Sequence, residues 1–179
     1  KFLITQSVKL MSKTLPDGRI MKELNGFIGS STLKDEKGRS FIISGKTDVV
    51  VEFKTNPKKY GIIDLKTTSI TPSKIQNYKL QLESYATIFQ NPNSKTPKFS
   101  NIDELGLFLF EPKEITKISE GSCNMKFETL YVKGNRCHKD LIKRVTNIID
   151  IYMLEKPPEY NTACSTCKFV ISLKKEKYI

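Results

Sequence analysis

The feature that most constrains this chain is a pair of short apolar runs, each carrying an acidic residue. The first reads VVVEF and follows Asp48, and the second, GIIDLKTT at 61–68, contains Asp64 and Lys66. Successive side chains of a strand point to opposite faces, so Asp64 and Lys66 share one face while Leu65 points to the other. The two acids and the lysine are therefore predicted to converge at the edge of a small sheet.

These groups suit a divalent metal and a water. Mg²⁺ takes oxygen ligands and keeps several waters, so Asp48, Asp64 and the backbone carbonyl of Leu65 are the candidate metal ligands. Lys66 is the candidate group for orienting a water or stabilising charge on a phosphate. Two neighbouring carboxylates favour its protonated form, which argues against a role as general base. A bound metal would lower the pKa of the water itself.

Three motifs follow one another in the middle of the chain: Gly45-Lys46-Thr47-Asp48, then Asp64-Leu65-Lys66, then Gln81-Leu82-Glu83-Ser84-Tyr85. Gln81 and Tyr85 are four residues apart and lie on one face of a predicted helix. In this order, GxxD, DxK and QxxxY, the motifs resemble the PD-(D/E)XK nuclease superfamily. The resemblance is strongest to its RecB-type branch, which includes helicase-linked exonucleases, CRISPR adaptation nucleases and mitochondrial single-strand exonucleases.

The resemblance implies an α/β fold: one restriction-endonuclease-like domain over 1–179, with a mixed central sheet, an antiparallel meander and flanking helices. It implies a metal-dependent deoxyribonuclease that uses Mg²⁺ or Mn²⁺, an exonuclease or end-processing enzyme preferring single-stranded DNA. Gln81 would position the strand or a ligand, and Tyr85 would support DNA or the metal shell. Relatives also carry an acid or histidine ahead of the first catalytic strand, and this residue joins the metal site as a further ligand. Glu23 is the local candidate, since the one histidine, His138, lies far downstream.

Two other functions stay open. One is a catalytically inactive DNA-binding module on a nuclease-like fold, and the other is a basic α/β domain for a protein partner, which no residue specifically supports. The chain has 30 Lys and Arg against 19 Asp and Glu, a net charge of +11. This excess suits DNA, but it also suits a lysine-rich solvated surface. A helicase or integrase is a further expected partner from the resemblance.

The periodicity of the chain predicts the remaining elements. A turn is expected at 35–38, followed by strands at 40–45, 46–53 and 60–68 that form the antiparallel meander. Further along, the pattern predicts a helix at 72–89, a loop at 91–103, a buried strand at 104–110, a connection at 111–124, a strand at 125–132 and a helix at 137–155. No apolar run approaches the length of a membrane span and no signal peptide is recognised, so an intracellular protein is expected.

The four cysteines need separate treatment. Cys164-Ser165-Thr166-Cys167 is a CxxC at the position where related nucleases begin a cysteine set for a [4Fe–4S] cluster. A cluster or a zinc ion requires four thiolates. Four cysteines exist, but Cys123 and Cys137 stand at spacings foreign to that family. We therefore expect a remnant CxxC that packs the C-terminal segment, with an Fe–S cluster as the alternative.

Overall fold

The computed structural model describes residues 8–21, 24, 26–156, 158–159 and 163–175. The chain divides into two compact units, 1–143 and 144–179, and each is described by itself. A single domain over 1–179 remains a prediction. Among the described residues, no helix is both long and apolar enough to cross a membrane.

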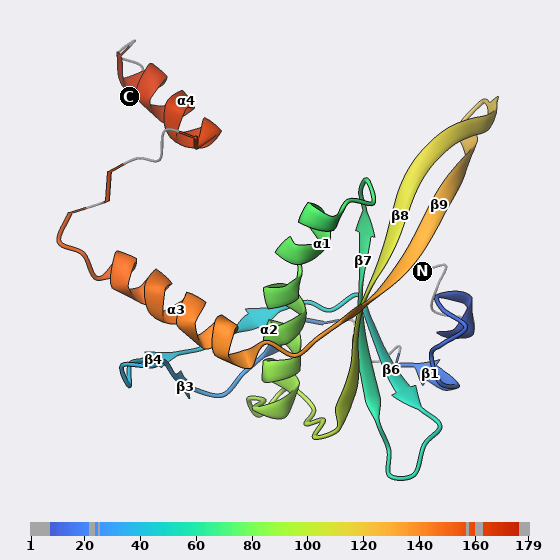
Figure 1. The fold of residues 1–179 in the computed structure, drawn as a ribbon, viewed down its shortest axis with the longest axis horizontal. Coiled ribbons are helices and arrows are strands. Elements are labelled where there is room, and N and C mark those ends of the chain that lie inside the picture. Colours follow the sequence, from blue (N-terminus) through green and yellow to red (C-terminus); the bar gives the residue numbers. More distant parts are fainter. Residues whose placement is uncertain (1–7, 22–23, 25, 157, 160–162, 176–179) are drawn as a thin grey trace. The chain divides into compact units, whose positions relative to one another are not determined.

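The first unit is built on a five-stranded mixed sheet with strand order β1-β6-β7-β8-β9 (Figure 1). Its strands are β1 (Gly18–Ile20), β6 (Val49–Phe53), β7 (Tyr60–Thr67), β8 (Ile102–Ser119) and β9 (Ser122–Gly134). β1, β6 and β7 pair antiparallel, β7 and β8 pair parallel, and β8 and β9 pair antiparallel. The predicted α/β fold, with a mixed sheet and an antiparallel meander, is confirmed.

The meander does not use the strand at 40–45, so that part of the prediction is wrong. This segment forms two small ladders: β4 (Ser40–Phe41) pairs with β3 (Leu33–Lys34), and β5 (Ser44–Gly45) pairs with β2 (Ile28–Gly29). The reason is local. Asp35 accepts hydrogen bonds from the backbone N–H groups of Lys37 and Arg39, which closes the predicted turn and pairs its two arms with each other. The third strand of the meander is instead β1.

Two consecutive helices replace the single predicted one, and the second of them lies against the sheet. α1 (Pro72–Asn77) and α2 (Lys79–Gln90) are separated at Tyr78, and α2 packs on β7 and β8. A 3-10 turn, η2 (Val8–Leu10), precedes β1. The predicted helix at 137–155 is α3 (His138–Tyr152), which starts in the first unit and continues into the second.

The apolar core consists of two clusters, one on each face of the sheet. The cluster on the α2 face contains Val50, Ile62, Leu82, Phe89, Leu107 and Leu109. The cluster on the opposite face contains Val8, Met11, Leu15, Val51, Ile63 and Phe108. β7 contributes alternate residues to both, so the alternation predicted for 60–68 decides which side chains reach which face.

The connection predicted at 111–124 is also wrong, because β8 and β9 continue through it as a paired hairpin (Figure 1). β-branched residues at 115, 116 and 118 favour extended backbone. A two-residue turn, Glu120-Gly121, then reverses the chain, with Gly121 at φ +73°. We call residues 111–130 the arm.

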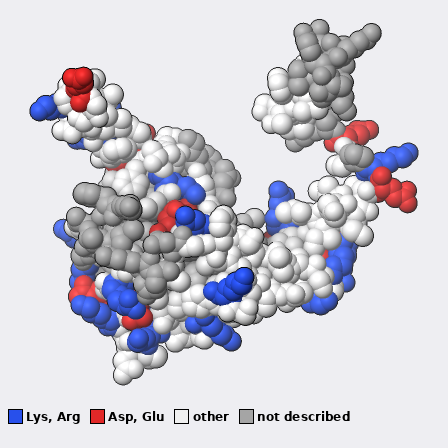
Figure 2. Space-filling view, turned by 180° about the vertical axis from the view of Figure 1, so that it is seen from behind, with Lys and Arg blue, Asp and Glu red and all other residues white. Residues whose placement is uncertain are grey.

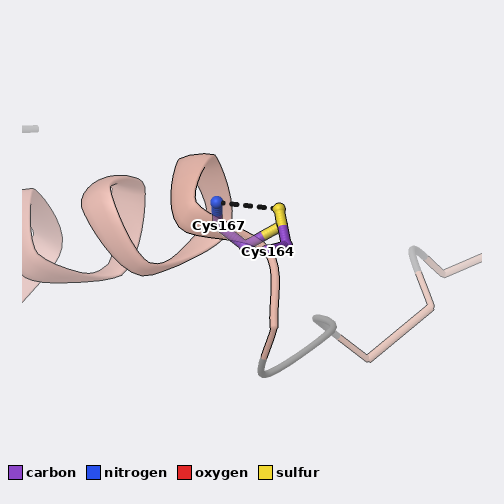
Figure 3. Close-up of a disulfide and its surroundings, with 2 residues drawn as sticks. All are labelled: Cys164 and Cys167. Atoms are coloured by element: carbon purple, nitrogen blue, oxygen red, sulfur yellow. Dashed lines mark hydrogen bonds between the residues drawn. A yellow bond between two sulfur atoms is a disulfide. The ribbon is translucent and has the colours of Figure 1, made fainter. Parts of the chain in front are cut away.

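In the second unit, the CxxC opens a helix. α4 (Ser165–Lys175) begins directly after Cys164. Cys164 and Cys167 are paired as a disulfide, and the Cys167 N–H donates to Cys164 Sγ at 3.1 Å (Figure 3). Cys123 and Cys137 are free thiols of the first unit. Neither unit, over its described residues, gathers three or more His, Cys, Asp or Glu side chains that could hold a metal.

Candidate active site

Asp48 stands where the pairing of β6 with β7 ends. The last paired residues are Val49 and Ile63, so Asp48 is the next residue of the chain opposite Asp64. Its carboxylate Oδ2 accepts the Leu65 backbone N–H at 2.8 Å, in place of a strand carbonyl. The N–H and C=O of one strand residue point to the same neighbouring strand. The Leu65 carbonyl is therefore directed towards the side on which Asp48 lies.

Asp64 and Lys66 project from β7 on the face covered by α2. Asp64 is only 2% exposed, and Lys66 Nζ lies 2.7 Å from Asp64 Oδ2. The same ammonium group lies 5.0 Å from the centre of the Tyr78 ring, a cation–π distance. The lysine is thus held between a carboxylate and an aromatic ring.

α2 supplies the remaining members of the cluster. Gln81 Nε2 donates to Tyr85 Oη at 2.8 Å and lies 3.3 Å from Asp64 Oδ1. The Tyr85 ring is buried and lies against Gly45, where an added Cβ would come within 3.0 Å of the ring. The glycine of GxxD thereby makes room for the tyrosine of QxxxY. The structure brings together Asp48, Asp64, Lys66, Gln81 and Tyr85, all five side chains that were predicted to be catalytic.

The charges of this cluster do not balance. Burial raises the pKa of Asp64, and the nearby Asp48 raises it further, while the ion pair with Lys66 opposes both effects. For Lys66, burial acts to lower the pKa, but the close contact with the Asp64 carboxylate and the charges of the two acids outweigh it and raise the pKa. Lys66 is therefore protonated, as expected from the sequence, and two acids share one lysine.

A divalent cation suits this imbalance. Asp64 Oδ2 is buried and receives no hydrogen bond of good geometry from any described residue, although Lys66 is close to it. Two carboxylates and one strand carbonyl form an all-oxygen set, which fits Mg²⁺ or Mn²⁺ with waters completing the shell. The other predicted ligand, Glu23, lies outside the described residues.

Glu52 is four residues from Asp48 on the same strand face but belongs to a different cluster. Its carboxylate pairs with Arg19 and with Lys58, each at 3.3 Å. The hydrogen bond from Arg19 lowers the pKa of Glu52, and burial opposes the shift. It forms a structural ion pair at the far end of β6.

Sequence reasoning missed a second buried acid. Glu83 lies between Gln81 and Tyr85 in the sequence. Its side chain is fully buried, but it contacts Arg136 and Cys137 and not the described residues of the candidate site. It accepts hydrogen bonds from Arg136 Nε at 2.8 Å, Arg136 Nη2 at 2.7 Å and the Cys137 N–H at 2.8 Å. Burial acts to raise the pKa of Glu83, but these donors outweigh it and lower the pKa. This pair fixes α2 to the start of α3.

Two further residues near the site were not predicted. Tyr78 interrupts the predicted helix and places its ring beside Lys66, and a tyrosine within a helical pattern gives no signal of either role. Thr47, the neighbour of Asp48, is buried with a hydroxyl that has no hydrogen-bond partner among the described residues. The only sequence signal for Thr47 was its position inside GxxD.

Comparison with known proteins identifies one family. The model of the PD-(D/E)XK nuclease superfamily matches residues 14–171, which include the whole cluster. Searches of curated proteins and of solved structures found no match.

Proposed function

The chain belongs to the PD-(D/E)XK nuclease superfamily, and we propose that it is a metal-dependent nuclease that hydrolyses phosphodiester bonds of DNA. The observation that carries the proposal is the state of Asp64. It is a buried carboxylate with a raised pKa, and it lies near a second acid, Asp48. The two acids share one neighbouring cation, Lys66. Such a group costs folding energy unless a ligand uses it, and strongly perturbed buried groups are typical of functional sites.

Mg²⁺ or Mn²⁺, when bound by Asp48, Asp64 and the Leu65 carbonyl, would supply a water of lowered pKa and a ligand position for a phosphate oxygen. The chain's own groups do the positioning. The Leu65 N–H fixes the Asp48 carboxylate, and Gln81 holds Asp64 from the other side. The protonated Lys66 places a positive charge beside the site, where it stabilises the charge that develops on the phosphate oxygens.

For DNA binding, the proposal rests on charge. The net charge of +11 favours contacts between lysines and the phosphate backbone. Affinity should then fall steeply with salt and depend little on base sequence. A salt-insensitive affinity would contradict this part of the proposal.

The finer assignment follows the motif order. GxxD, DxK and QxxxY in sequence support the RecB-type branch, and with it an intracellular exonuclease or end-processing enzyme that prefers single-stranded DNA and works beside a helicase or integrase. The geometry also explains why a glutamine and a tyrosine would stand at these two positions of QxxxY, because the Gln81 amide donates to both Asp64 and Tyr85.

The alternative is a DNA-binding module without activity. Its support is that the described residues supply only two acidic side chains to the site. This alternative predicts DNA binding by the purified chain and no metal-dependent cleavage.

The test is a cleavage assay on end-labelled single- and double-stranded DNA with Mg²⁺, Mn²⁺ or EDTA. Wild type is compared with Lys66→Ala and with the control Lys59→Ala, which removes an exposed lysine paired to Asp103 just outside β7. We expect cleavage that EDTA abolishes, that Lys66→Ala loses and that Lys59→Ala keeps. The product ladder then gives the polarity and the strand preference.

Two results would overturn the proposal. Equal cleavage by wild type and Lys66→Ala would place the activity outside this site. Metal-independent DNA binding without cleavage, in either metal and on either substrate, would establish the inactive module instead.

A further inference from the structure

A cavity lies beside the turn that joins β6 and β7, at the end of β6 remote from Asp48. We call it the turn cavity. Glu52 is four residues from Asp48 on the same strand face, which at about 3.3 Å per residue places it roughly 13 Å away along β6. The turn cavity is therefore separate from the candidate active site. Its volume is about 400 Å³, and its wall includes Arg19, Glu52, Lys54, Thr55 and Lys58.

The charged groups of the turn cavity are mostly basic. Arg19, Lys54 and Lys58 contribute three positive charges and Glu52 contributes one negative charge, which gives a net charge of +2. Figure 2 shows Lys and Arg side chains along the lower edge of the first unit, the edge at which Figure 1 draws the turn between β6 and β7. A cavity with this charge attracts an anion.

The one acid of the cavity wall holds two of its cations. Glu52 Oε2 lies 3.3 Å from Arg19 Nη2, and Glu52 Oε1 lies 3.3 Å from Lys58 Nζ. The Glu52 side chain is only 17% exposed, whereas those of Arg19 and Lys58 are 57% and 66% exposed. The carboxylate is therefore largely screened from solvent, and a ligand can reach both cations.

Two further hydrogen-bond donors belong to the cavity wall. The Lys54 ammonium is exposed, and no described residue forms an ion pair with it. The Thr55 hydroxyl is buried and has no hydrogen-bond partner among the described residues. Buried polar groups are normally hydrogen-bonded, so an anion bound against Thr55 would supply an acceptor that the described protein does not.

Backbone hydrogen bonds fix the turn that carries these groups. The Phe53 N–H donates to the Lys59 carbonyl at 2.9 Å and closes the turn. The Lys54 N–H donates to the Asp17 carbonyl at 2.7 Å, which ties the turn to the segment before β1. The backbone therefore needs little rearrangement when a ligand binds, which lowers the entropic cost of binding.

The charge and the size of the turn cavity favour a phosphate monoester over a diester. A monoester carries a charge of about −1.5 to −2 near neutral pH, which matches the cavity, whereas each backbone diester carries about −1. The cavity volume also falls within the range of small-molecule pockets, roughly 300–1,000 Å³. There is therefore room for part of a nucleotide beside its phosphate.

We propose that the turn cavity binds the phosphate monoester of a nucleotide, with Arg19, Lys54 and Lys58 contacting the phosphate oxygens. The choice of a nucleotide rests on the proposed nuclease function. Hydrolysis of a phosphodiester by water leaves a hydroxyl on one product end and a phosphate monoester on the other. The monoester has two sources, the end of a DNA strand and a free mononucleotide.

Fluorescence anisotropy tests the first source. Three internally labelled single-stranded oligonucleotides of one sequence are compared, with a phosphate at the 5′ end, at the 3′ end or at neither. EDTA is present throughout, so neither metal nor cleavage contributes, and failure of the proposed nuclease function would be a separate result. We expect wild type to bind one phosphorylated strand about fivefold more tightly than the unphosphorylated strand.

The variants separate this cavity from general charge attraction. Lys54→Glu lowers the net charge of the cavity to zero and should abolish the preference for the phosphorylated strand. The matched control Lys117→Glu makes the same charge change on the arm, beyond the Thr67–Phe110 pair at the other end of β7, and should keep the preference. Circular dichroism confirms that each variant is folded.

Calorimetry with dAMP and with deoxyadenosine, which lacks the phosphate, tests the second source. Binding of dAMP but not of deoxyadenosine, lost in Lys54→Glu, would show that the cavity accepts a free mononucleotide. Binding of neither compound, with a preference for a phosphorylated strand, would assign the site to a DNA end. Equal binding of the three strands together with no binding of dAMP overturns the proposal, and so does a preference that Lys54→Glu retains.

Discussion

Asp64 and Glu83 are both almost fully buried acids with a basic side chain in contact, yet their pKa values move in opposite directions. Glu83 receives three N–H donors, two from Arg136 and one from the backbone. Asp64 receives one amide at 3.3 Å, shares Lys66 and lies near a second acid. The number of donors, more than burial, separates them. Glu83 is a completed structural ion pair, whereas Asp64 lacks a comparable set of donors, which is why we propose a cation there.

The largest expected difference concerns activity. Asp64→Asn should lower the cleavage rate by at least about 10²-fold, because it removes a candidate metal ligand and the charge that holds Lys66. The free energy of unfolding of the metal-free protein should stay the same or rise, since a neutral amide is less costly to bury than a carboxylate. Single-turnover cleavage and urea denaturation measure the two effects. If Asp64→Asn lost as much stability as a variant that breaks the Glu83–Arg136 ion pair, the distinction between the two acids would be wrong.

Breaking the other pair should act on stability. Arg136→Met leaves Glu83 buried without its main donors and should lower the free energy of unfolding by about 3 kcal/mol, the lower end for a buried pair because Arg136 is partly exposed. Urea denaturation measures the change. As the control, Lys59→Met breaks the exposed pair with Asp103 and should cost less than about 1 kcal/mol. Equal costs for the two variants would contradict a structural role for Glu83.

The pH dependence of stability should show the depressed pKa of Glu83. An acid whose pKa is lower in the folded state stabilises the fold above its unfolded pKa, about 4.3, and loses this contribution as the pH falls through its folded pKa. The difference in unfolding free energy between wild type and Glu83→Gln should therefore be constant near neutral pH and shrink in acid. A difference that does not vary with pH would mean that the carboxylate charge contributes nothing.

The smallest effect on activity is expected where the GxxD and QxxxY motifs contact each other, at Gly45 and Tyr85. Gly45→Ala places a Cβ 3.0 Å from the Tyr85 ring, which must shift by a few tenths of an ångström and move the hydroxyl that Gln81 contacts. We expect a several-fold loss in kcat with little change in KM, and less than about 1 kcal/mol of stability. Gly26→Ala is the control, since an added Cβ there meets nothing within 4 Å. Matching losses in both variants would argue against the Gly45–Tyr85 contact.

Local patterns in the sequence predicted the strand and helix that present the cluster. Alternation along 60–68 placed Asp64 and Lys66 on one face, and the spacing of Gln81 and Tyr85 placed both on the helix face that meets it. These predictions rest on the strand period of two residues and the helix period of about four, which depend only on residues close together in the sequence.

Contacts between distant segments could not be predicted in this way. β1 has only three residues, and its Gly18 pairs with Phe53, which is distant in the sequence, so no local pattern predicts this strand. Glu83 and Arg136 are 53 residues apart in the chain, and only the folded structure brings them together. The sequence pattern predicts a connection at 111–124 because charged residues obscure the alternation there, whereas the strand predicted at 125–132 is part of β9.

The most direct test of the account is a Mn²⁺-binding titration of the metal-free chain, followed by electron paramagnetic resonance. Wild type, Asp64→Asn and Arg136→Met are compared under conditions in which each is folded. The account predicts a Mn²⁺ site in wild type and Arg136→Met that Asp64→Asn loses. Equal Mn²⁺ binding by wild type and Asp64→Asn would show that this buried acid does not hold the metal, and would contradict the account.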